Sequence, residues 1–597
     1  MGRSGFAAAA SSALILALLA SSALADVPKA SVEGQLDKGL RKEIERAIGE
    51  SKTRPDSRFD ARRRAREAAE AAIAVLRSEG YYAYEVTPDV SEGEPPQGVV
   101  RIVPGQRFTF RELQLQWIGE PPAPDVAKAG LDAVQLHPGE PGRAADVLAA
   151  EGRIVAAVQH HGYADVEARP RIVSVDHADR SVNPTFNIAA GQLVKLDGVN
   201  VVTDGRTNPN WVRGLAPWKS GDPYDPDDVA ELERRLLDVG VYDSVTVALA
   251  TKDKSENGLR PVVVSLADRP PRTLELGAGY STSDGPGFDA KWVHYNRLHR
   301  ADALTFTAKA ARIEQQLDIE LALPHWRRPG QTLKIGGGFL GHDTDAYRDG
   351  GLGVRVDVER RYTRTTYITV GVAADYTQID EKRADNPLAT PVGETLKLGI
   401  LTFLTAFALD RSNDPLNPTT GWRLEARAEP TGITGDRTLA YVKTQAQASV
   451  YVPFRARGGT VIAGRIKLGS ILGGKLPDVP ADRRFYAGGG GSVRGYAYQA
   501  VGPRLLDNTP QGGLSLFEAS VELRQKVSDK WGVVAFLDTG AVGTNQTPDF
   551  RNTSAGAGIG VRYDLGFGPF RVDLAVPLNR RKGDAKFQAY LSIGQSF

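Results

Sequence analysis

The sequence predicts three small α+β domains followed by a transmembrane antiparallel β-barrel of about 16 strands. Before residue 270, a helix, a glycine and a strand recur in this order three times. After residue 271, apolar and polar residues alternate in segments of about 10 residues. No run of about 18 apolar residues follows residue 26, so no membrane helix is expected there. With 597 residues the chain is too long for one compact core.

Residues 1–25 have the pattern of a secretory signal peptide. Arg3 provides a basic start, residues 13–20 are apolar, and Ala23 and Ala25 form a small-x-small cleavage site. An uncleaved membrane anchor is the alternative, but serines interrupt the apolar run and the run is short. The mature chain is therefore expected to start near residue 26.

Composition excludes several kinds of site. The 74 basic and 72 acidic residues nearly balance, which gives no general argument for nucleic-acid binding. Cysteine is absent, so no disulfide, thiolate metal site or lipid-anchored cysteine is possible. His160 and His161 adjoin a glycine turn without a second ligand cluster in the sequence, and a surface pair is preferred over a metal site. No metal, no cofactor and no nucleic-acid partner is expected.

The three recurring units predict the domain boundaries within the first half of the chain. Helical patterns cover residues 65–79, 145–159 and 228–239, and the glycines that follow are Gly80, Gly162 and Gly240. Glycine just after a helix suits a left-handed cap. A second marker, apolar alternation around a Gly-Gln pair, occurs at Gly105 and at Gly191. Three recurrences argue against a coincidence between unrelated domains. The predicted domains are residues 26–106, 107–192 and 193–270.

Residues 271–597 are predicted to form the barrel. In residues 351–359, Leu352 and Val354 fall on one face, while Arg355 and Asp357 fall on the other. About 16 such segments fit a membrane barrel, whose apolar face meets lipid and whose polar face lines a wet lumen. A soluble sandwich also alternates, but its strands are usually shorter and its polar face meets bulk water. The last strand is predicted at residues 586–597.

Four motifs in order carry a family resemblance. They are S-V-R-G-Y at residues 492–496, A-S-V-E-L at 519–523, F-L-D-T-G at 536–540, and D-R-S-N-D-P-L-N-P-T-T-G-W at 410–422. The chain resembles the BamA/TamA superfamily of outer-membrane assembly and translocation factors, which carry periplasmic POTRA domains before a 16-stranded barrel. Three POTRA-like units make it most similar to TamA-like members, which assemble autotransporters. Gln595 departs from the family pattern, which has an aromatic or apolar residue two positions before the final Phe.

The resemblance implies that a loop at residues 473–513 folds back into the lumen. Gly488, Gly489, Gly490 and Gly491 give the loop conformational freedom and allow close approach to the wall. The motif Arg494-Gly495-Tyr496 follows. Alternation turns Glu522 inward, and the family pattern does the same for Asp538 and Gly540, so Arg494 has two candidate acidic partners. The alternative is a solvated surface arginine, which contributes little to stability.

A seam between the first and last barrel strands is also expected. Gly277 and Gly279 interrupt the first strand, and Gly594 and Phe597 belong to the last. Small residues at tight barrel corners explain these glycines equally well. In the family, these two strands pair poorly, which implies a lateral opening where a client strand adds by β-augmentation.

These observations imply a protein of the bacterial outer membrane with POTRA domains in the periplasm. The expected partners are outer-membrane lipid, unfolded outer-membrane or autotransporter clients, and a TamB-like periplasm-spanning protein. A secretion pore for a dedicated client and a structural anchor for a periplasmic partner are the alternatives. An enzyme is not expected, because the G-x-G-x-x-G pattern at residues 336–341 lies within a predicted barrel strand and opens no helix.

Overall fold

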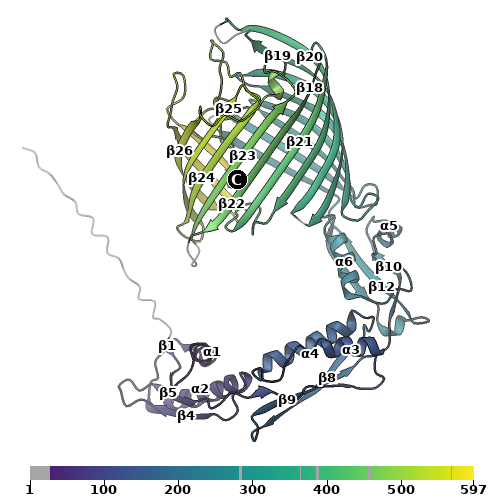
Figure 1. The fold of residues 1–597 in the computed structure, drawn as a ribbon, viewed down its shortest axis with the longest axis vertical. Coiled ribbons are helices and arrows are strands. Elements are labelled where there is room, and N and C mark those ends of the chain that lie inside the picture. Colours follow the sequence, from purple (N-terminus) through teal and green to yellow (C-terminus); the bar gives the residue numbers. More distant parts are fainter. Residues whose placement is uncertain are drawn as a thin grey trace, which may run out of the picture. The chain divides into compact units, whose positions relative to one another are not determined.

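A computed structural model describes residues 27–281, 285–363, 365–384, 389–454, 459–566, 568–593 and 595–597. The predicted signal peptide and Gly594 lie outside the described residues. The chain divides into two compact units (Figure 1). One contains residues up to 197 together with 218–228 and 251–260, and the other contains 198–217, 229–250 and 261–597.

The three N-terminal domains share one topology: a strand, two helices and two further strands, with the last strand in the centre of the sheet. The first consists of β1 (Val27–Pro28), β2 (Ala30–Glu33), α1 (Lys38–Ile48), β3 (Glu50–Ser51), α2 (Arg58–Ser78), β4 (Glu85–Val90) and β5 (Gly98–Val103), with sheet order β2-β5-β4. The second consists of β6 (Thr109–Phe110), β7 (Gln114–Trp117), α3 (Pro124–Asp132), α4 (Ala144–Gln159), β8 (Glu167–Asp176) and β9 (Ser181–Ala189). Here β6 and β7 both pair with one edge of β9, and β8 pairs with the other.

The third domain repeats this order. It consists of β10 (Lys195–Thr203), α5 (Pro209–Arg213), α6 (Pro226–Leu237), β11 (Tyr242–Leu249), the 3₁₀ turn η1 (Lys252–Lys254) and β12 (Leu259–Asp268), and its sheet order is β10-β12-β11. Gly80, Gly162 and Gly240 all have positive φ, of 87°, 94° and 70°, in agreement with the predicted left-handed caps. The repeat read from the sequence is therefore a repeat of backbone structure.

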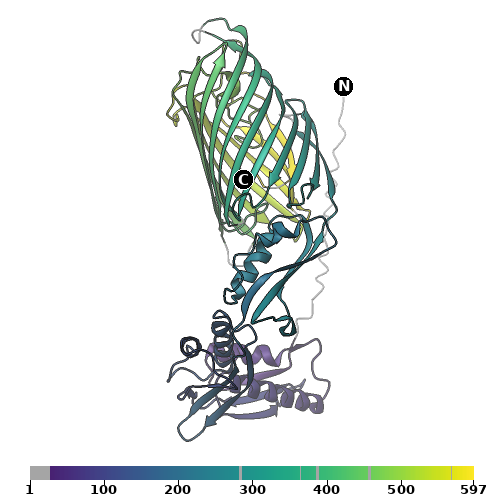
Figure 2. The ribbon, with the colours of Figure 1, turned by 90° about the vertical axis from the view of Figure 1, so that its right-hand side faces the viewer.

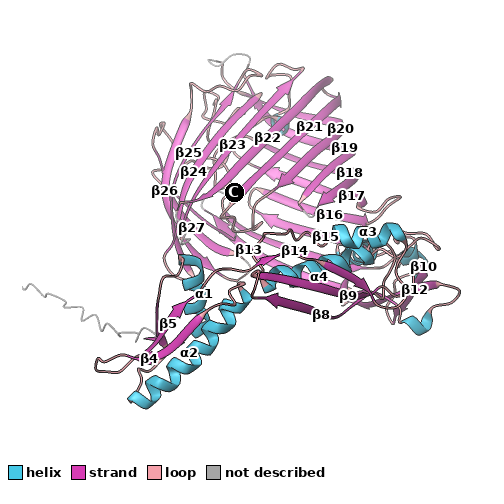
Figure 3. Ribbon diagram, turned by 60° about the horizontal axis from the view of Figure 1, so that its bottom comes forward, coloured by secondary structure: helices cyan, strands magenta, loops and turns pink. Residues whose placement is uncertain are grey.

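The helices of these domains are amphipathic and locally capped. Helix α2 begins after Ser57, whose hydroxyl accepts a hydrogen bond from the Asp60 amide, and it buries a stripe that ends at Leu76. Figure 3 shows in cyan that α1 to α4 belong to these domains, whereas the barrel is built of strands. Among the residues that the structure describes, no helix combines the length and the apolar character needed to cross a membrane.

The second half is a closed barrel of the sixteen strands β13 to β28, each antiparallel to its neighbour in sequence, as predicted. The strands run obliquely across the wall (Figure 2). Their bounds are β13 (Arg272–Ser281), β14 (Gly285–Tyr295), β15 (Ala303–Ala311), β16 (Glu314–Leu323), β17 (Gln331–Asp343), β18 (Tyr347–Thr363), β19 (Thr366–Arg383), β20 (Val392–Asp410), β21 (Gly421–Gly435), β22 (Leu439–Pro453), β23 (Thr460–Leu472), β24 (Ser515–Lys526), β25 (Trp531–Gly543), β26 (Ser554–Asp564), β27 (Pro569–Pro577) and β28 (Gln588–Ile593).

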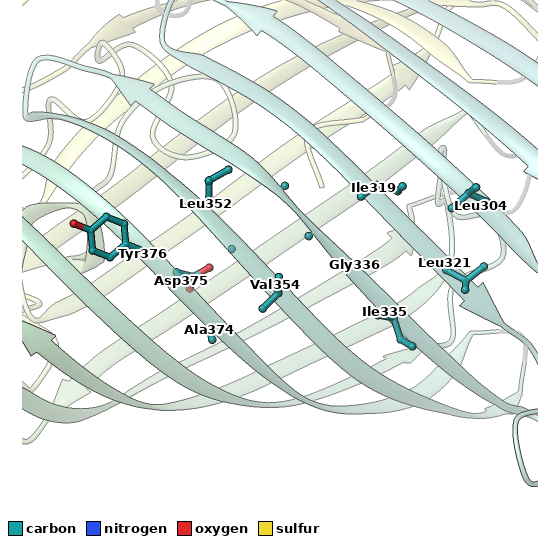
Figure 4. Close-up of a pocket in the computed structure, with 13 residues that line it drawn as sticks. Leu304, Ile319, Leu321, Ile335, Gly336, Leu352, Val354, Ala374, Asp375 and Tyr376 are labelled. Atoms are coloured by element: carbon teal, nitrogen blue, oxygen red, sulfur yellow. The ribbon is translucent and has the colours of Figure 1, made fainter.

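The outer face of the barrel is apolar. Leu352 and Val354 are 65% and 64% exposed, whereas Arg355 on the opposite face of β18 forms an ion pair with Asp318 in the lumen. A shallow groove of about 860 Å³ on this outer face is lined by Ile335, Leu352, Val354 and other side chains of β15 to β19 (Figure 4). The glycine run 336–338 contributes to it and lies within β17, as the sequence predicted for this pattern. The groove belongs to the lipid-facing surface.

The prediction for the last strand is wrong at its end. Strand β28 stops at Ile593, and residues 595–597 leave the sheet. The Phe597 ring stacks on Tyr451 of β22, with ring centroids 6.5 Å apart, and the guanidinium of Arg524 on β24 lies 5.3 Å from its centroid. Phe597 is therefore inside the lumen and is not part of the predicted seam. The aromatic and cationic partners across the lumen draw it away from the strand direction, which sequence alternation cannot reveal.

Candidate functional site inside the barrel

The connection between β23 and β24 enters the lumen. It leaves Leu472, forms the 3₁₀ turn η2 (Ala481–Arg483), and returns to Ser515. Paired backbone bridges join Phe485 to Gly513 and Ala487 to Val501, so the segment folds as a hairpin. Its Val493, Arg494 and Tyr496 are almost completely buried. We refer to residues 473–514 as the lumen loop.

Arg494 lies among three carboxylates from three different strands. Its Nε and Nη2 donate to the two oxygens of Asp538 at 2.6 and 2.9 Å, in a bidentate arrangement. Its Nη2 is also 2.8 Å from Glu522 Oε1, and its Nη1 donates to Asp573 Oδ2 at 3.1 Å. The Arg494 side chain is 1% exposed and the three acids are 0% exposed. The planar guanidinium has enough donors for all three partners.

Strand alternation explains how these acids meet the arginine. Glu522 on β24 and Asp538 on β25 lie on inward faces, as the sequence indicated. Phe536 shares the face of Asp538, and its ring centroid lies 3.4 Å from the Arg494 guanidinium carbon. Asp573 on β27 was not among the predicted partners, although it alternates with outward-facing Val572 and Leu574. The alternation of β27 in the sequence indicates that Asp573 faces inward, but it does not show how close Asp573 lies to the loop.

Three further arginines balance the buried acids. Arg524 Nε contacts Glu522 Oε2 at 2.9 Å. Arg562 Nη1 and Arg571 Nε lie 2.5 and 3.5 Å from the carboxylate of Asp573. Buried charges are costly unless they are paired, and here the paired groups form one connected network. The arrangement fixes a position of the loop.

The four loop glycines serve packing more than mobility. Gly488 and Gly489 have φ values of 108° and 104°, where other residues are strained. A Cβ on Gly490 would lie 2.9 Å from the ring of Tyr590 on β28, whereas a Cβ on Gly491 would meet nothing within 4 Å. Glycine is therefore required by backbone conformation at Gly488 and Gly489 and by close packing at Gly490, whereas neither reason applies at Gly491.

The remaining motif residues hold the loop tip to the wall. A Cβ on Gly540 would lie 2.7 Å from Val493, so this glycine admits the loop. The Tyr496 hydroxyl donates to Asn579 Oδ1 at 2.6 Å. Gly495 and Tyr496 also contact Tyr590 through their backbones. Tyr590 was not predicted, because a tyrosine in a barrel strand has no sequence signal for such a role.

The contact between the first and last strands is short. Among the described residues, the ladder between β13 and β28 pairs only Ser281 with Tyr590, whereas β13 pairs with β14 at all ten of its residues. A Cβ on Gly277 would meet the Asp289 carboxylate of β14 at 2.4 Å, and one on Gly279 would meet nothing within 4 Å. The Asp289 side chain is exposed and can move, so packing explains neither Gly277 nor Gly279.

The histidine pair in the second domain has neighbours that the sequence did not indicate. His160 Nδ1 lies 2.9 Å from Asp225 Oδ1, and the potential ligand atoms of His160, Asp225 and Asp227 lie within 4.8 Å of one another. Asp225 accepts the Asp227 amide hydrogen at the start of α6 and thereby caps that helix. The cluster is explained by helix capping and an exposed contact between His160 and Asp225.

A closed barrel with an apolar outer face, preceded by three small domains of one repeated fold, is the architecture of a transmembrane β-barrel protein with POTRA-like domains. The model of the Omp85 superfamily domain matches residues 296–597. The chain belongs to the Omp85 superfamily.

Similar proteins and structures agree with this assignment. The chain is 21% identical over 529 residues to the outer membrane protein assembly factor BamA of Neorickettsia risticii, covering 85% of this chain and 69% of that protein. It is 21% identical over 588 residues to BamA of Neisseria meningitidis serogroup B, covering 87% and 71%. The crystal structure of BamA from Haemophilus ducreyi lacking POTRA domains 1–3 matches with a TM-score of 0.66 at 18% identity, over 82% of this chain and 100% of that one.

Proposed function

We propose that this protein is an outer-membrane assembly factor that inserts or secretes β-barrel and autotransporter clients through the seam between β13 and β28. Its membership of the Omp85 superfamily and its similarity to proteins named as outer membrane protein assembly factors support this function. The observation that supports the mechanism is the short ladder between the two strands, which has the pair Ser281 with Tyr590 among the residues that the structure describes. A strand edge with unpaired N–H and C=O groups is a template for an added strand.

The lumen loop argues for the seam over the alternative of a wide secretion pore. Its Val493 and Tyr496 belong to one buried core with wall residues such as Ile379 and Leu398. A client that crossed the lumen would first have to break this core and the Arg494 network. A client at the seam would instead displace the contact between β13 and β28, and backbone pairing and apolar burial supply the free energy without nucleotide.

The proposed roles of the other parts follow. Arg494, with Glu522 and Asp538, holds the lumen loop in one conformation. The three POTRA-like domains resemble a TamA-type arrangement in the periplasm, and their sheet edges are candidate contacts for clients or a TamB-like partner. The barrel resides in outer-membrane lipid, and we propose no catalytic activity.

The seam is testable by crosslinking because the chain has no natural cysteine. Extending the antiparallel register from Ser281 and Tyr590 places Gly279 opposite Ser592. We propose to reconstitute the double variant Gly279→Cys and Ser592→Cys in liposomes with an unfolded autotransporter. Client folding is scored by heat-dependent mobility on gels.

The crosslinked protein should lose client folding, and reduction or omission of the crosslinker should restore it. Each single-cysteine variant serves as a control for the substitution. Undiminished folding with a fully crosslinked seam would exclude the lateral route and leave the pore or anchor functions. A stable, large single-channel conductance would favour the pore.

A further inference from the structure

Helix α2 of the first domain exposes a basic surface with one aromatic ring. Residues 52–66 contain seven basic and two acidic residues. Phe59, in the first turn of α2, is 80% exposed. Among the residues that the structure describes, it is the most exposed large apolar side chain, the lipid-facing ones of the barrel included. The other exposed residues of α2 between positions 58 and 70 are all charged.

Arg58, Arg62 and Arg66 form a row along this surface. Residues four apart lie on one face of a helix, about 6 Å from each other along its axis. Phe59 lies beside the row, because it is three residues before Arg62. The three guanidinium groups have no hydrogen-bond or ion-pair partner within the part of the chain that the structure describes. Three unpaired positive charges therefore surround an exposed aromatic ring.

The acidic residues of the same turns are already paired elsewhere. Asp60 forms ion pairs with Arg63 and Arg64, and Glu67 forms one with Arg63. Nothing in the helix neutralises the row of arginines. Like charges four residues apart destabilise a helix, and positive charge near its N-terminus opposes the helix dipole. The row thus has a local energetic cost that an external anion would offset.

Two further basic residues flank the row. Arg64 Nη1 donates to the Thr53 carbonyl oxygen at 2.8 Å, which holds the segment before α2 against the helix. Lys52 and Arg54 in this segment are exposed, and their side chains have no partner among the described residues. We define the basic face as Lys52, Arg54, Arg58, Phe59, Arg62 and Arg66.

The chemistry of the basic face fits a bilayer surface of anionic phospholipid. Clusters of four to eight basic residues bind such surfaces, and an aromatic ring suits the boundary between headgroups and acyl chains. The apolar stripe of α2, which runs from Ala61 to Leu76, is buried in the domain. The helix therefore meets the surface with its charged side and inserts only Phe59. A stable protein partner would need roughly 800 Å² from each side, which one end of a helix with a single apolar ring does not offer.

We infer that the basic face of the first domain binds the surface of a phospholipid bilayer through its anionic headgroups, with Phe59 inserted between them. In the periplasmic location proposed for these domains, that surface is a phospholipid leaflet that faces the periplasm. The binding rests on that proposed location, but it does not depend on opening of the seam.

Binding is tested with the full-length protein in nanodiscs of zwitterionic phosphatidylcholine. The nanodiscs are mixed with vesicles of phosphatidylcholine, with or without phosphatidylglycerol, and binding is measured by flotation. The natural protein should float with the phosphatidylglycerol vesicles, and added salt should release it. Each basic residue near an anionic surface contributes about fivefold, so Arg58→Gln, Arg62→Gln and Arg66→Gln combined should lower the binding constant about a hundredfold.

Arg101→Gln is the matched control for loss of charge. Arg101 is exposed on β5, whereas its neighbours Val100 and Ile102 are buried in one core with Ala72 of α2. Successive side chains of a strand point to opposite faces, so Arg101 lies on the side of the sheet away from α2. Its substitution should change binding by less than about twofold, because salt screens charges at that distance. Undiminished binding of the triple variant, or an equal loss per charge in Arg101→Gln, would overturn the proposed site.

The aromatic ring is tested separately. Phe59→Ala should weaken binding roughly tenfold, because the ring loses its apolar surroundings. Val103→Ala shortens another exposed apolar side chain, on the far side of the sheet, and should leave binding unchanged. The chain has no natural cysteine, so Phe59→Cys can carry an environment-sensitive fluorophore. Its emission should shift to the blue with phosphatidylglycerol vesicles, and that of labelled Val103→Cys should not. Equal emission at both positions would contradict the insertion of residue 59.

A soluble acidic chain separates a membrane from a protein partner. Polyglutamate, added to the nanodiscs without vesicles, should bind more weakly than phosphatidylglycerol vesicles, because it has no apolar layer for Phe59. Equally tight binding of polyglutamate would assign the basic face to an acidic protein and overturn the membrane site. Failure of the proposed function is recognised separately, by client folding through the crosslinked seam, which flotation does not measure.

Discussion

The seam and the wall formed by β18, β19 and β20 are held together in different ways. Every one of the 18 residues of β19 pairs with β20, and β18 pairs with β19 along nearly its whole length. The described ladder between β13 and β28 has one pair, and β28 is only 6 residues long. Backbone hydrogen bonds between strands hold the first region, whereas in the second the Tyr590 side chain of β28 also bonds to the backbone of the lumen loop.

The largest expected effect is that of Arg494→Ala. It leaves Glu522, Asp538 and Asp573 buried without their shared cation, and removing one partner of a buried ion pair typically costs about 3–5 kcal/mol. Client folding in liposomes should be abolished, while the ladder-held wall keeps the barrel folded on semi-native gels.

Arg494→Lys tests whether the positive charge alone is sufficient. It keeps the charge but cannot form the bidentate contact with Asp538 together with the contacts to the other two acids, so activity should remain low. Arg494→Asp combined with Asp538→Arg should restore activity only in part, because Glu522 and Asp573 remain. Full activity of either single Arg494 variant would contradict the network.

Asp573→Asn should have the next largest effect. It removes the charge that links Arg494 to Arg562 while keeping the shape of the side chain, and charged hydrogen bonds contribute about 1.5–3 kcal/mol. We expect roughly a tenfold lower rate of client folding. Asp318→Asn, which breaks a lumen ion pair with Arg355 in another part of the wall, should leave the rate unchanged. Equal losses in both variants would indicate a general requirement for lumen charges.

Glu381→Gln should have a smaller effect on client folding. Glu381 on β19 accepts the backbone N–H of Ala481 and contacts Arg437 at 2.9 Å, so it anchors the base of the loop to the ladder-held wall. The substitution should shift client folding by less than about tenfold, because the tip contacts remain. A loss of client folding in Glu381→Gln as large as that in Arg494→Ala would contradict this smaller role for the base of the loop.

Asp165→Asn should affect neither region of the barrel. Asp165 forms a bidentate pair with Arg260, with oxygen to nitrogen distances of 2.8 and 2.7 Å. These hydrogen bonds lower the pKa of Asp165. A lowered pKa in the folded state stabilises the fold above the unfolded value of about 3.9, and this stabilisation is lost as pH falls through the folded pKa.

The substitution should therefore lower the midpoint of N-terminal domain unfolding at neutral pH, and the difference from the natural protein should shrink below about pH 4. Circular dichroism of the helices in the N-terminal domains measures this. A changed barrel stability on semi-native gels in Asp165→Asn would contradict the independence of the barrel.

Much of the fold was predictable because its signals are local. Alternation with period two marks the barrel strands and turns Glu522 inward wherever β24 lies in the wall. Gly80, Gly162 and Gly240 mark helix ends because glycine has no Cβ and therefore adopts positive φ without strain. The motif around Arg494 indicated the ionic contacts of the loop, and the structure places Glu522 and Asp538 at those contacts.

Other features depended on which strands face one another across the lumen. The sequence analysis did not predict the contacts of Asp573 and Tyr590 with the loop, or the inward turn of Phe597. Alternation predicts whether a side chain faces the lumen or the lipid, but it does not predict which residues it contacts across the lumen. That depends on barrel curvature, strand stagger and the path of the loop. The sequence by itself determined the strands, their faces and the charged loop tip. The closed barrel decided that this tip meets the last strand, because only closure brings β24, β25, β27 and β28 around one loop.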